Sequence, residues 1–217
     1  GVAISEAGKT LTELPKLWLR PQDEVAGRVV KVTGWELVEQ AWQDGHGILF
    51  LTPHLGCFEI TAQYYAAHRP ITVLYRRPKQ DWLAPIIEQG RGTNLKLAPA
   101  DIGGVRKLIK ALKSGEAVGM LPDQAPKAGE GIWAPFFGKP AYTMTLAARL
   151  VQTGATVILA FGERLHYGAG YHLRLFAPTG GVMTPESINR EIERLVQLCP
   201  EQYLWGYNRY KGEPAQL

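Results

Sequence analysis

The chain has 217 residues, of which 46% are hydrophobic and 20% charged, and its formal net charge is +4. This length and composition predict one domain, residues 1–217, with a sizeable buried core. Its two cysteines, Cys57 and Cys199, are too few and too far apart for a disulfide scaffold or a zinc site, so a reducing compartment is expected.

Residues 11–20 carry leucines and a tryptophan among a few charges. This segment predicts either a short helix packed on the core or a helix lying on a membrane surface. No apolar stretch is long enough to cross a bilayer and no signal peptide is visible, so a membrane-spanning segment is not expected within this sequence.

Predicted strands and helices alternate along the rest of the chain. Apolar runs bounded by turn residues predict strands at 48–51, 71–75, 95–98, 117–121, 156–161 and 172–176. Helical patterns occupy 35–42, 58–68, 80–89, 105–113, 143–151 and 187–198. The alternation predicts an α/β fold with a largely parallel central sheet flanked by helices. Chemistry is then expected at the carboxyl ends of the strands.

His54 and Glu59 follow the first predicted strand, in the segment Thr52-Pro53-His54-Leu55-Gly56-Cys57-Phe58-Glu59. Five residues of continuous helix would turn the two side chains roughly 140° apart, so they meet only if His54 lies in the turn and Glu59 begins the next helix. His54 would then be a general base, with Glu59 fixing its tautomer. The alternative is a histidine packed in a turn and a carboxylate placed at a helix N-terminus, where the helix dipole favours it.

Other polar groups follow later strands and helices. Arg76 and Arg77 follow the second strand, Arg91 lies between two glycines, and Asp123 and Gln124 follow the fourth strand. Together they predict a site with a base, a carboxylate and arginines that bind phosphate. The stretch 76–113 holds nine Lys and Arg against three Asp and Glu, which favours phosphate groups, an acidic protein or an anionic membrane.

The sequence contains no P-loop, no dinucleotide-binding fingerprint and no Gly-x-Ser-x-Gly elbow. Cys57 lies three residues from His54, so a thiol nucleophile remains an alternative. Its apolar neighbours indicate a small buried residue instead.

Five short motifs resemble the lipid A biosynthesis acyltransferases, the late lauroyl and myristoyl transferases of Gram-negative bacteria. In order they are His54 with Glu59, Tyr75-Arg76-Arg77-Pro78, Gly90-Arg91-Gly92, Leu121-Pro122-Asp123-Gln124 with 133–138, and 200–205 with 209–211. The chain departs from many family members by having Cys57-Phe58-Glu59 where they have Asn-Trp-Glu. The N-terminal membrane segment that usually precedes this region in the family is expected to be absent here, as in a truncated or divergent chain.

The resemblance implies a glycerolipid acyltransferase-like fold and transfer of a fatty acyl chain from acyl carrier protein to a hydroxyl of a lipid A precursor. His54 would deprotonate that hydroxyl and Glu59 would hold His54. Arg91 would contact phosphate or the oxyanion, and Asp123 would organise the basic groups. Arg76, Arg77 and Gln124 are expected to bind substrate.

The resemblance also implies a location at the cytoplasmic face of the bacterial inner membrane, either peripheral or anchored by a segment that this sequence does not include. Acyl carrier protein, a lipid A precursor and the membrane surface are the expected partners, and nucleic acid is not. No metal and no cofactor beyond acyl carrier protein or coenzyme A as acyl carrier is expected. Three alternatives remain: an acyltransferase for a glycerophospholipid, glycolipid or aminolipid, a non-catalytic lipid- or carrier-binding domain, and a thiol hydrolase using Cys57. Related glycerolipid enzymes usually carry Asp where this chain has Glu59, which favours the lipid A class.

Overall fold

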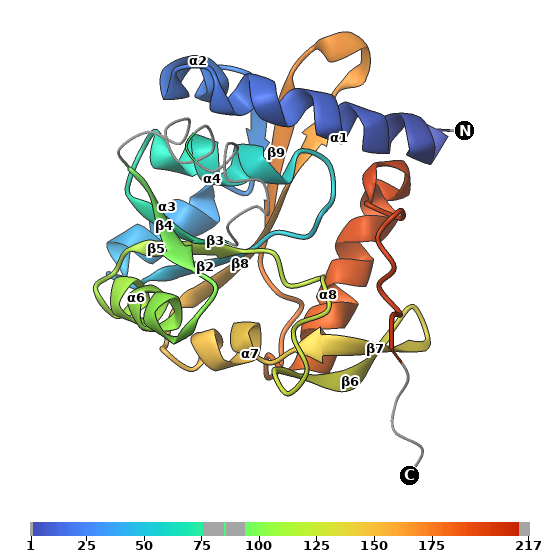
Figure 1. The fold of residues 1–217 in the computed structure, drawn as a ribbon. Coiled ribbons are helices and arrows are strands. Elements are labelled where there is room, and N and C mark those ends of the chain that lie inside the picture. Colours follow the sequence, from blue (N-terminus) through green and yellow to red (C-terminus); the bar gives the residue numbers. More distant parts are fainter. Residues whose placement is uncertain (1, 76–84, 86–93, 213–217) are drawn as a thin grey trace.

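The computed structural model describes residues 2–75, 85 and 94–212, which form a seven-stranded sheet with helices on both faces (Figure 1). The strand order is β1-β9-β8-β2-β5-β3-β4. The strands of this sheet are β1 (Val29–Thr33), β2 (Ile48–Leu51), β3 (Ile71–Tyr75), β4 (Leu95–Pro99), β5 (Ala117–Met120), β8 (Thr156–Arg164) and β9 (Tyr171–Phe176). All neighbours run parallel except β8 and β9, so the predicted largely parallel sheet is confirmed.

The helices of the described residues are α1 (Val2–Trp18), α2 (Gln22–Ala26), α3 (Glu36–Gln43), α4 (Phe58–Ala66), α6 (Ile102–Lys113), α7 (Leu146–Val151) and α8 (Pro185–Leu198). Two short 3-10 turns, η1 (His166–Gly168) and η2 (Pro200–Gln202), complete them. A separate antiparallel hairpin is formed by β6 (Gly131–Phe136) and β7 (Lys139–Met144).

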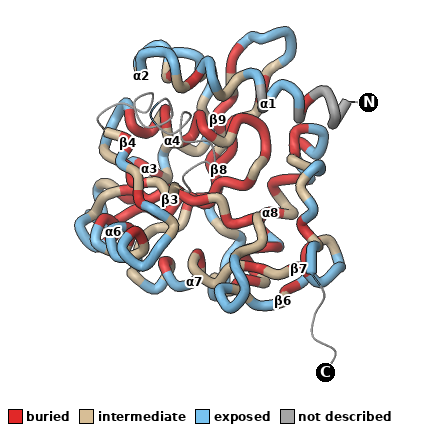
Figure 2. Tube along the Cα trace, in the orientation of Figure 1, coloured by how far each residue is buried: buried red, intermediate tan, exposed pale blue. Residues whose placement is uncertain are grey.

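The buried residues of the central strands point alternately into two cores, because successive side chains of a strand face opposite sides of the sheet. Ile48 and Phe50 of β2 pack with α3 and α4, whereas Leu49 and Leu51 pack with α6, α7 and α8. All four residues of β2 are buried, and Figure 2 shows the buried strands enclosed by more exposed helices. Burial on both faces explains why β2 reads as a continuous apolar run.

Most predicted elements are found close to their predicted bounds. The strands predicted at 48–51 and 71–75 match β2 and β3 residue for residue, and the helix predicted at 187–198 is α8, which begins two residues earlier. The helix predicted at 143–151 is partly wrong, because Thr143 and Met144 end β7 and α7 begins only at Leu146. The helix predicted at 80–89 lies outside the described residues, apart from residue 85.

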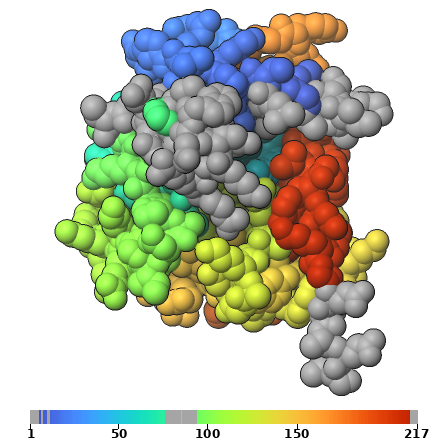
Figure 3. All heavy atoms as spheres, in the orientation of Figure 1, coloured from blue at the N-terminus to red at the C-terminus, as the bar shows by residue number. Residues whose placement is uncertain are grey.

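The N-terminal helix α1 packs on the protein rather than projecting from it. Leu17 of α1 and Val25 of α2 form a small core with Cys57 and Ile60, at the start of α4. Figure 3 shows α1 crossing one face of the molecule above the C-terminal segment, with α6 and the β6–β7 hairpin below. Of the helices described, none is long and apolar enough to span a membrane.

Candidate active site

Two neighbouring parallel strands bring His54 and Asp123 together. Leu51, the last residue of β2, pairs in register with Met120, the last residue of β5. The backbone N–H of Thr52 then donates to the Met120 carbonyl at 3.0 Å, so both chains leave the sheet side by side. His54 and Asp123 each lie three residues beyond this pair, which places them at the same carboxyl edge, as the sequence predicted for the chemistry of an α/β sheet.

The Asp123 carboxylate makes two hydrogen bonds to His54. Its Oδ1 lies 2.8 Å from the ring Nδ1 and its Oδ2 accepts from the His54 backbone N–H at 2.9 Å. Asp123 is only 2% exposed. Burial by itself raises the pKa of the Asp123 carboxyl, but the charge and hydrogen bonds of His54 outweigh it and hold that pKa below its ordinary 3.8. Asp123 is therefore ionised at neutral pH and can only accept hydrogen bonds.

This geometry fixes the tautomer of His54. Because Asp123 only accepts, Nδ1 carries a proton, and in the neutral ring Nε2 is then the nitrogen with the lone pair. The side-chain amide of Gln124 lies 3.2 Å from Nε2 and donates to it. The Phe58 ring lies beside the imidazole, with 5.0 Å between the ring centroids. The neutral imidazole thus has an oriented basic nitrogen, which is what a general base requires.

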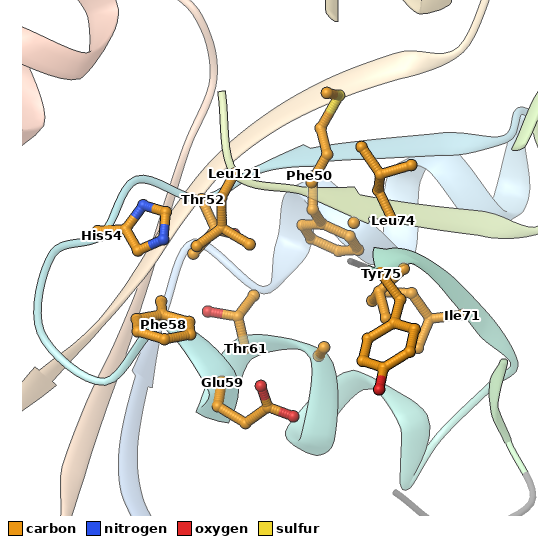
Figure 4. A pocket seen from close by; sticks show the side chains of 14 residues that line it. Phe50, Thr52, His54, Phe58, Glu59, Thr61, Ile71, Leu74, Tyr75 and Leu121 are labelled. Carbon is orange, nitrogen blue, oxygen red and sulfur yellow. The ribbon is translucent and has the colours of Figure 1, made fainter. Parts of the chain in front are cut away.

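The expectation that Glu59 orients His54 differs from the structure, which gives Nδ1 to Asp123. Glu59 does begin α4, as the sequence predicted, and it is buried. Its carboxylate, however, points away from the imidazole, with Phe58 and Thr61 between them (Figure 4). The physical reason is that α4 begins at Phe58, so the first helical turn directs Glu59 along α4 while His54 faces β5.

A cavity of about 280 Å³ opens beside His54, between the sheet and α4. His54, Phe58 and Glu59 lie at one end, and Phe50, Ile71, Leu74 and Tyr75 lie at the other (Figure 4). Its volume is close to the lower end of the roughly 300–1,000 Å³ range of small-molecule sites. The walls are mainly aliphatic and aromatic, so the cavity suits an apolar chain whose reactive end reaches His54.

The C-terminal segment contributes groups that the sequence left without a role. The buried Tyr203 hydroxyl lies near Asp123, and burial together with the negative charge of Asp123 raises the pKa of Tyr203, so the hydroxyl stays protonated. Leu204 donates from its backbone N–H to the His54 carbonyl at 3.0 Å. Both partners belong to motifs noted in the sequence, Asp123 to the fourth and Tyr203 and Leu204 to the fifth. The sequence did not show that these two motifs meet, because they are far apart along the chain.

Three predicted arginines lie outside the described residues. They are Arg76, Arg77 and Arg91, and their assignment to substrate stays a prediction.

The Cys57 thiol is buried. Cys57 is 1% exposed, and burial, followed by the charge of Glu13, raises the pKa of its thiol well above the ordinary 9.0. A buried thiol that holds its proton is a poor nucleophile. Among the described residues, no three His, Cys, Asp or Glu side chains are grouped as metal ligands.

The fold and the site together define an α/β protein that holds an oriented histidine at the carboxyl edge of its sheet, beside an apolar cavity. The sequence matches the family of bacterial lipid A biosynthesis acyltransferases over residues 3–212. It is 29% identical over 222 residues to the lipid A biosynthesis lauroyltransferase of Escherichia coli K12, covering 97% of this chain and 71% of that protein. It is 26% identical over 215 residues to the palmitoleoyltransferase of the same strain, covering 96% and 70%.

A lipid A biosynthesis acyltransferase of Haemophilus influenzae is 28% identical over 183 residues, which cover 79% of this chain and 56% of that protein. The chain belongs to the bacterial lipid A biosynthesis acyltransferase family. It is therefore an acyltransferase of lipid A synthesis.

Proposed function

We propose that this protein transfers a fatty acyl chain from acyl carrier protein to a hydroxyl of a lipid A precursor, with His54 as the general base. The observation that carries this proposal is the bonded series Asp123–His54–Gln124 at the end of an apolar cavity. Asp123 fixes the proton on Nδ1, which leaves Nε2, beside the Gln124 amide, as the proton acceptor.

The reaction begins when the acceptor hydroxyl takes the place of the Gln124 amide at Nε2. His54 removes the hydroxyl proton as the oxygen attacks the thioester carbonyl, and a tetrahedral intermediate forms. The carbon–sulfur bond then breaks, an ester is released, and the imidazolium returns the proton to the departing thiolate. Asp123 stabilises the positive charge on His54 throughout these steps.

The acyl chain lies in the cavity between the sheet and α4. Its carbonyl end is at His54 and its methyl end is toward Phe50, Ile71 and Tyr75. Burying a chain in such walls contributes about 0.8 kcal/mol for each methylene removed from water. The depth of this cavity then sets the preferred chain length.

The donor docks through the exposed basic face of α6. Arg106, Lys107, Lys110 and Lys113 are exposed, while Leu108 and Leu112 of the same helix are buried in the core. Acyl carrier protein is acidic, and a face of one charge sign raises the rate of encounter with an opposite one. Reversing Arg106 and Lys110 to Glu should raise KM for the carrier-bound donor and leave coenzyme A-bound donor unaffected. Equal effects on both donors would argue against docking at α6.

The acceptor is a membrane lipid, so we place the enzyme at the cytoplasmic face of the inner membrane. The transfer is tested by mass spectrometry of lipid products, using purified wild type with a lipid A precursor and either acyl carrier protein or coenzyme A as donor. His54→Ala is the test variant. His46→Ala is its matched control, because His46 is exposed and precedes β2 at the opposite end of the strand from His54.

We expect an added acyl mass with wild type and His46→Ala, and a loss of about 100- to 10,000-fold in rate with His54→Ala. Near-normal turnover by folded His54→Ala would overturn the assignment of the base. Acylation of a glycerophospholipid or aminolipid but not of the lipid A precursor would overturn the assignment of the acceptor. The absence of any transfer by folded wild type would favour a lipid- or carrier-binding role.

A further inference from the structure

The turn that carries His54 is held by hydrogen bonds along its backbone. Gly56 adopts φ +60°, and a side chain there would collide with the Gly162 carbonyl, 2.1 Å from an ideal Cβ. Its N–H donates to the Gln202 carbonyl at 3.0 Å, and the next N–H, of Cys57, donates to Gly162 at 2.7 Å. These contacts come from β8 and from the C-terminal segment, which fixes two sides of the turn.

A third side of the turn depends on a buried arginine. Arg164, at the end of β8, donates from Nη2 to the Gly56 carbonyl at 2.8 Å. Its own backbone N–H and carbonyl are both bonded by the side-chain amide of Gln202, at 2.8 and 2.9 Å. The Arg164 side chain is 7% exposed, so its charge must be balanced by protein groups rather than by water.

That balance comes from α1. Glu13 Oε1 accepts from Arg164 Nε at 2.9 Å and from Nη2 at 2.6 Å. Glu6, two turns earlier in α1, lies 3.5 Å from Nη1. The second oxygen of Glu13 accepts from the Tyr171 hydroxyl at 3.0 Å, so the carboxylate is held on both sides. Within α1, then, Glu6 and Glu13 supply negative charge to the guanidinium that holds the turn.

These contacts form a continuous path from α1 to the base. Glu13 holds Arg164, Arg164 holds the Gly56 carbonyl, and Gly56 lies two residues after His54. If Glu13 leaves, Arg164 becomes a buried charge without its closest partner, and the guanidinium would turn toward water and release Gly56. A displacement of about 1 Å in a catalytic group can cost about 100-fold in rate.

We propose that Arg164, clamped by Glu13, is a positioning residue that makes the placement of His54 depend on the docking of α1. Neither residue touches the reacting atoms, and the helix serves as part of the scaffold of the active site. For its activity readout this inference rests on the proposed acyl transfer. Its second readout, hydrogen exchange of the turn, requires no reaction.

The test compares Glu13→Gln and Arg164→Lys with wild type and with Glu24→Gln. Glu24 is the matched control because it also pairs with an arginine, Arg20, near the N-terminus, but both side chains of that pair are exposed. Lysine keeps the charge at position 164 but loses the planar fork that bonds Glu13 and Gly56 together. We expect kcat to fall about 10- to 100-fold in Arg164→Lys and about 10-fold in Glu13→Gln, with KM nearly unchanged.

The double variant Glu13→Gln/Arg164→Lys should be no slower than Arg164→Lys alone, because both changes break one path. Amide exchange over residues 54–57 should accelerate in both single variants and not in Glu24→Gln. Should either variant fail to fold, Tyr171→Phe removes only the hydroxyl that holds Glu13, and a fall of about 2- to 5-fold in kcat is expected.

Unchanged kcat together with unchanged exchange in the folded variants would overturn the inference. Faster exchange with unchanged kcat would also overturn it, since α1 would then hold the turn without affecting the base. If wild type itself transfers no acyl chain, the proposed function fails. The exchange data then still decide whether Glu13 and Arg164 hold the turn.

Discussion

Replacing Asp123 by Asn would test which carboxylate orients the base. Two donors point at Asp123, the ring Nδ1–H and the backbone N–H of His54, and each uses one carboxylate oxygen. Asparagine has only one oxygen, so its amide NH₂ must face one of these donors or turn the ring. The substitution keeps the volume of the side chain but removes both the second acceptor and the negative charge that would stabilise the imidazolium.

The expected loss follows from the role of Asp123. In the serine protease triad, the equivalent Asp-to-Asn change lowers kcat about 10⁴-fold by favouring the wrong tautomer. General-base catalysis as a whole contributes about 10²- to 10⁴-fold. We therefore expect kcat to fall at least about 100-fold in Asp123→Asn, which corresponds to about 2.7 kcal/mol of transition-state stabilisation. KM should change little, because Asp123 is buried behind the imidazole.

The assay is the initial rate of acyl transfer, measured with Asp123→Asn, Glu59→Gln and the control Asp44→Asn. Asp44 is exposed at the end of α3, where it accepts from Gln40 at 2.9 Å, so its change should leave the rate unaltered. Glu59 lines the cavity, and its replacement should act mainly on KM. A large loss of kcat in Glu59→Gln with near-normal kcat in Asp123→Asn would refute the reasoning.

Three further substitutions and one pH dependence follow from the same contacts. Cys57→Ala should keep most activity, and rapid inactivation of wild type by a thiol alkylator that Cys57→Ala resists would favour the hydrolase alternative. Gly119→Val should shift the preference among acyl donors toward shorter acyl chains in a competition assay. The reason is that even a Cβ at position 119 would lie 3.2 Å from the Val73 side chain in the cavity wall. An unchanged preference would place the acyl chain outside this cavity. Gly56→Ala should destabilise folding by more than about 2 kcal/mol in denaturant titration, because φ is positive and Gly162 blocks the Cβ; a smaller change would mean that the turn can relax. Because the pKa of Asp123 is lower in the folded protein, its stabilisation is fully present above the ordinary value of 3.8 and is lost as the pH falls through the folded value. The difference in unfolding free energy between wild type and Asp123→Asn should therefore shrink below pH 3.8, and a difference that stays constant there would contradict the shift.

Local sequence patterns were sufficient to predict the strands and helices that have a regular pattern of buried residues. The strands β2 and β3 are apolar runs between turn residues, and α6 places Leu108 and Leu112 on one face and its lysines on the other. Because these signals are periodic and local, they could be read without knowing any contact. The same is true of the placement of Glu59 in the first turn of α4.

Elements with weak periodicity were missed. The β6–β7 hairpin turns at Phe137 and Gly138, with φ of 46° and 73°, but Pro135 and Pro140 interrupt the strand pattern on both sides. The edge strand β1 has exposed or half-buried residues throughout, and among the described strands its one partner is β9. Such strands are stabilised by a neighbour rather than by their own sequence.

The sequence by itself determined the α/β class, and it predicted the edge of the sheet that carries the site and His54 as the base. It also supplied Asp123 and Gln124 as site residues. Only the tertiary structure decided that Asp123 rather than Glu59 bonds Nδ1, because that choice depends on the register of β2 against β5 across 69 residues of sequence. The clamp from Glu13 to Arg164 spans 151 residues and was equally invisible. Periodicity encodes which face of an element is buried, whereas the partner met at that face is set by strand order and by packing between distant segments.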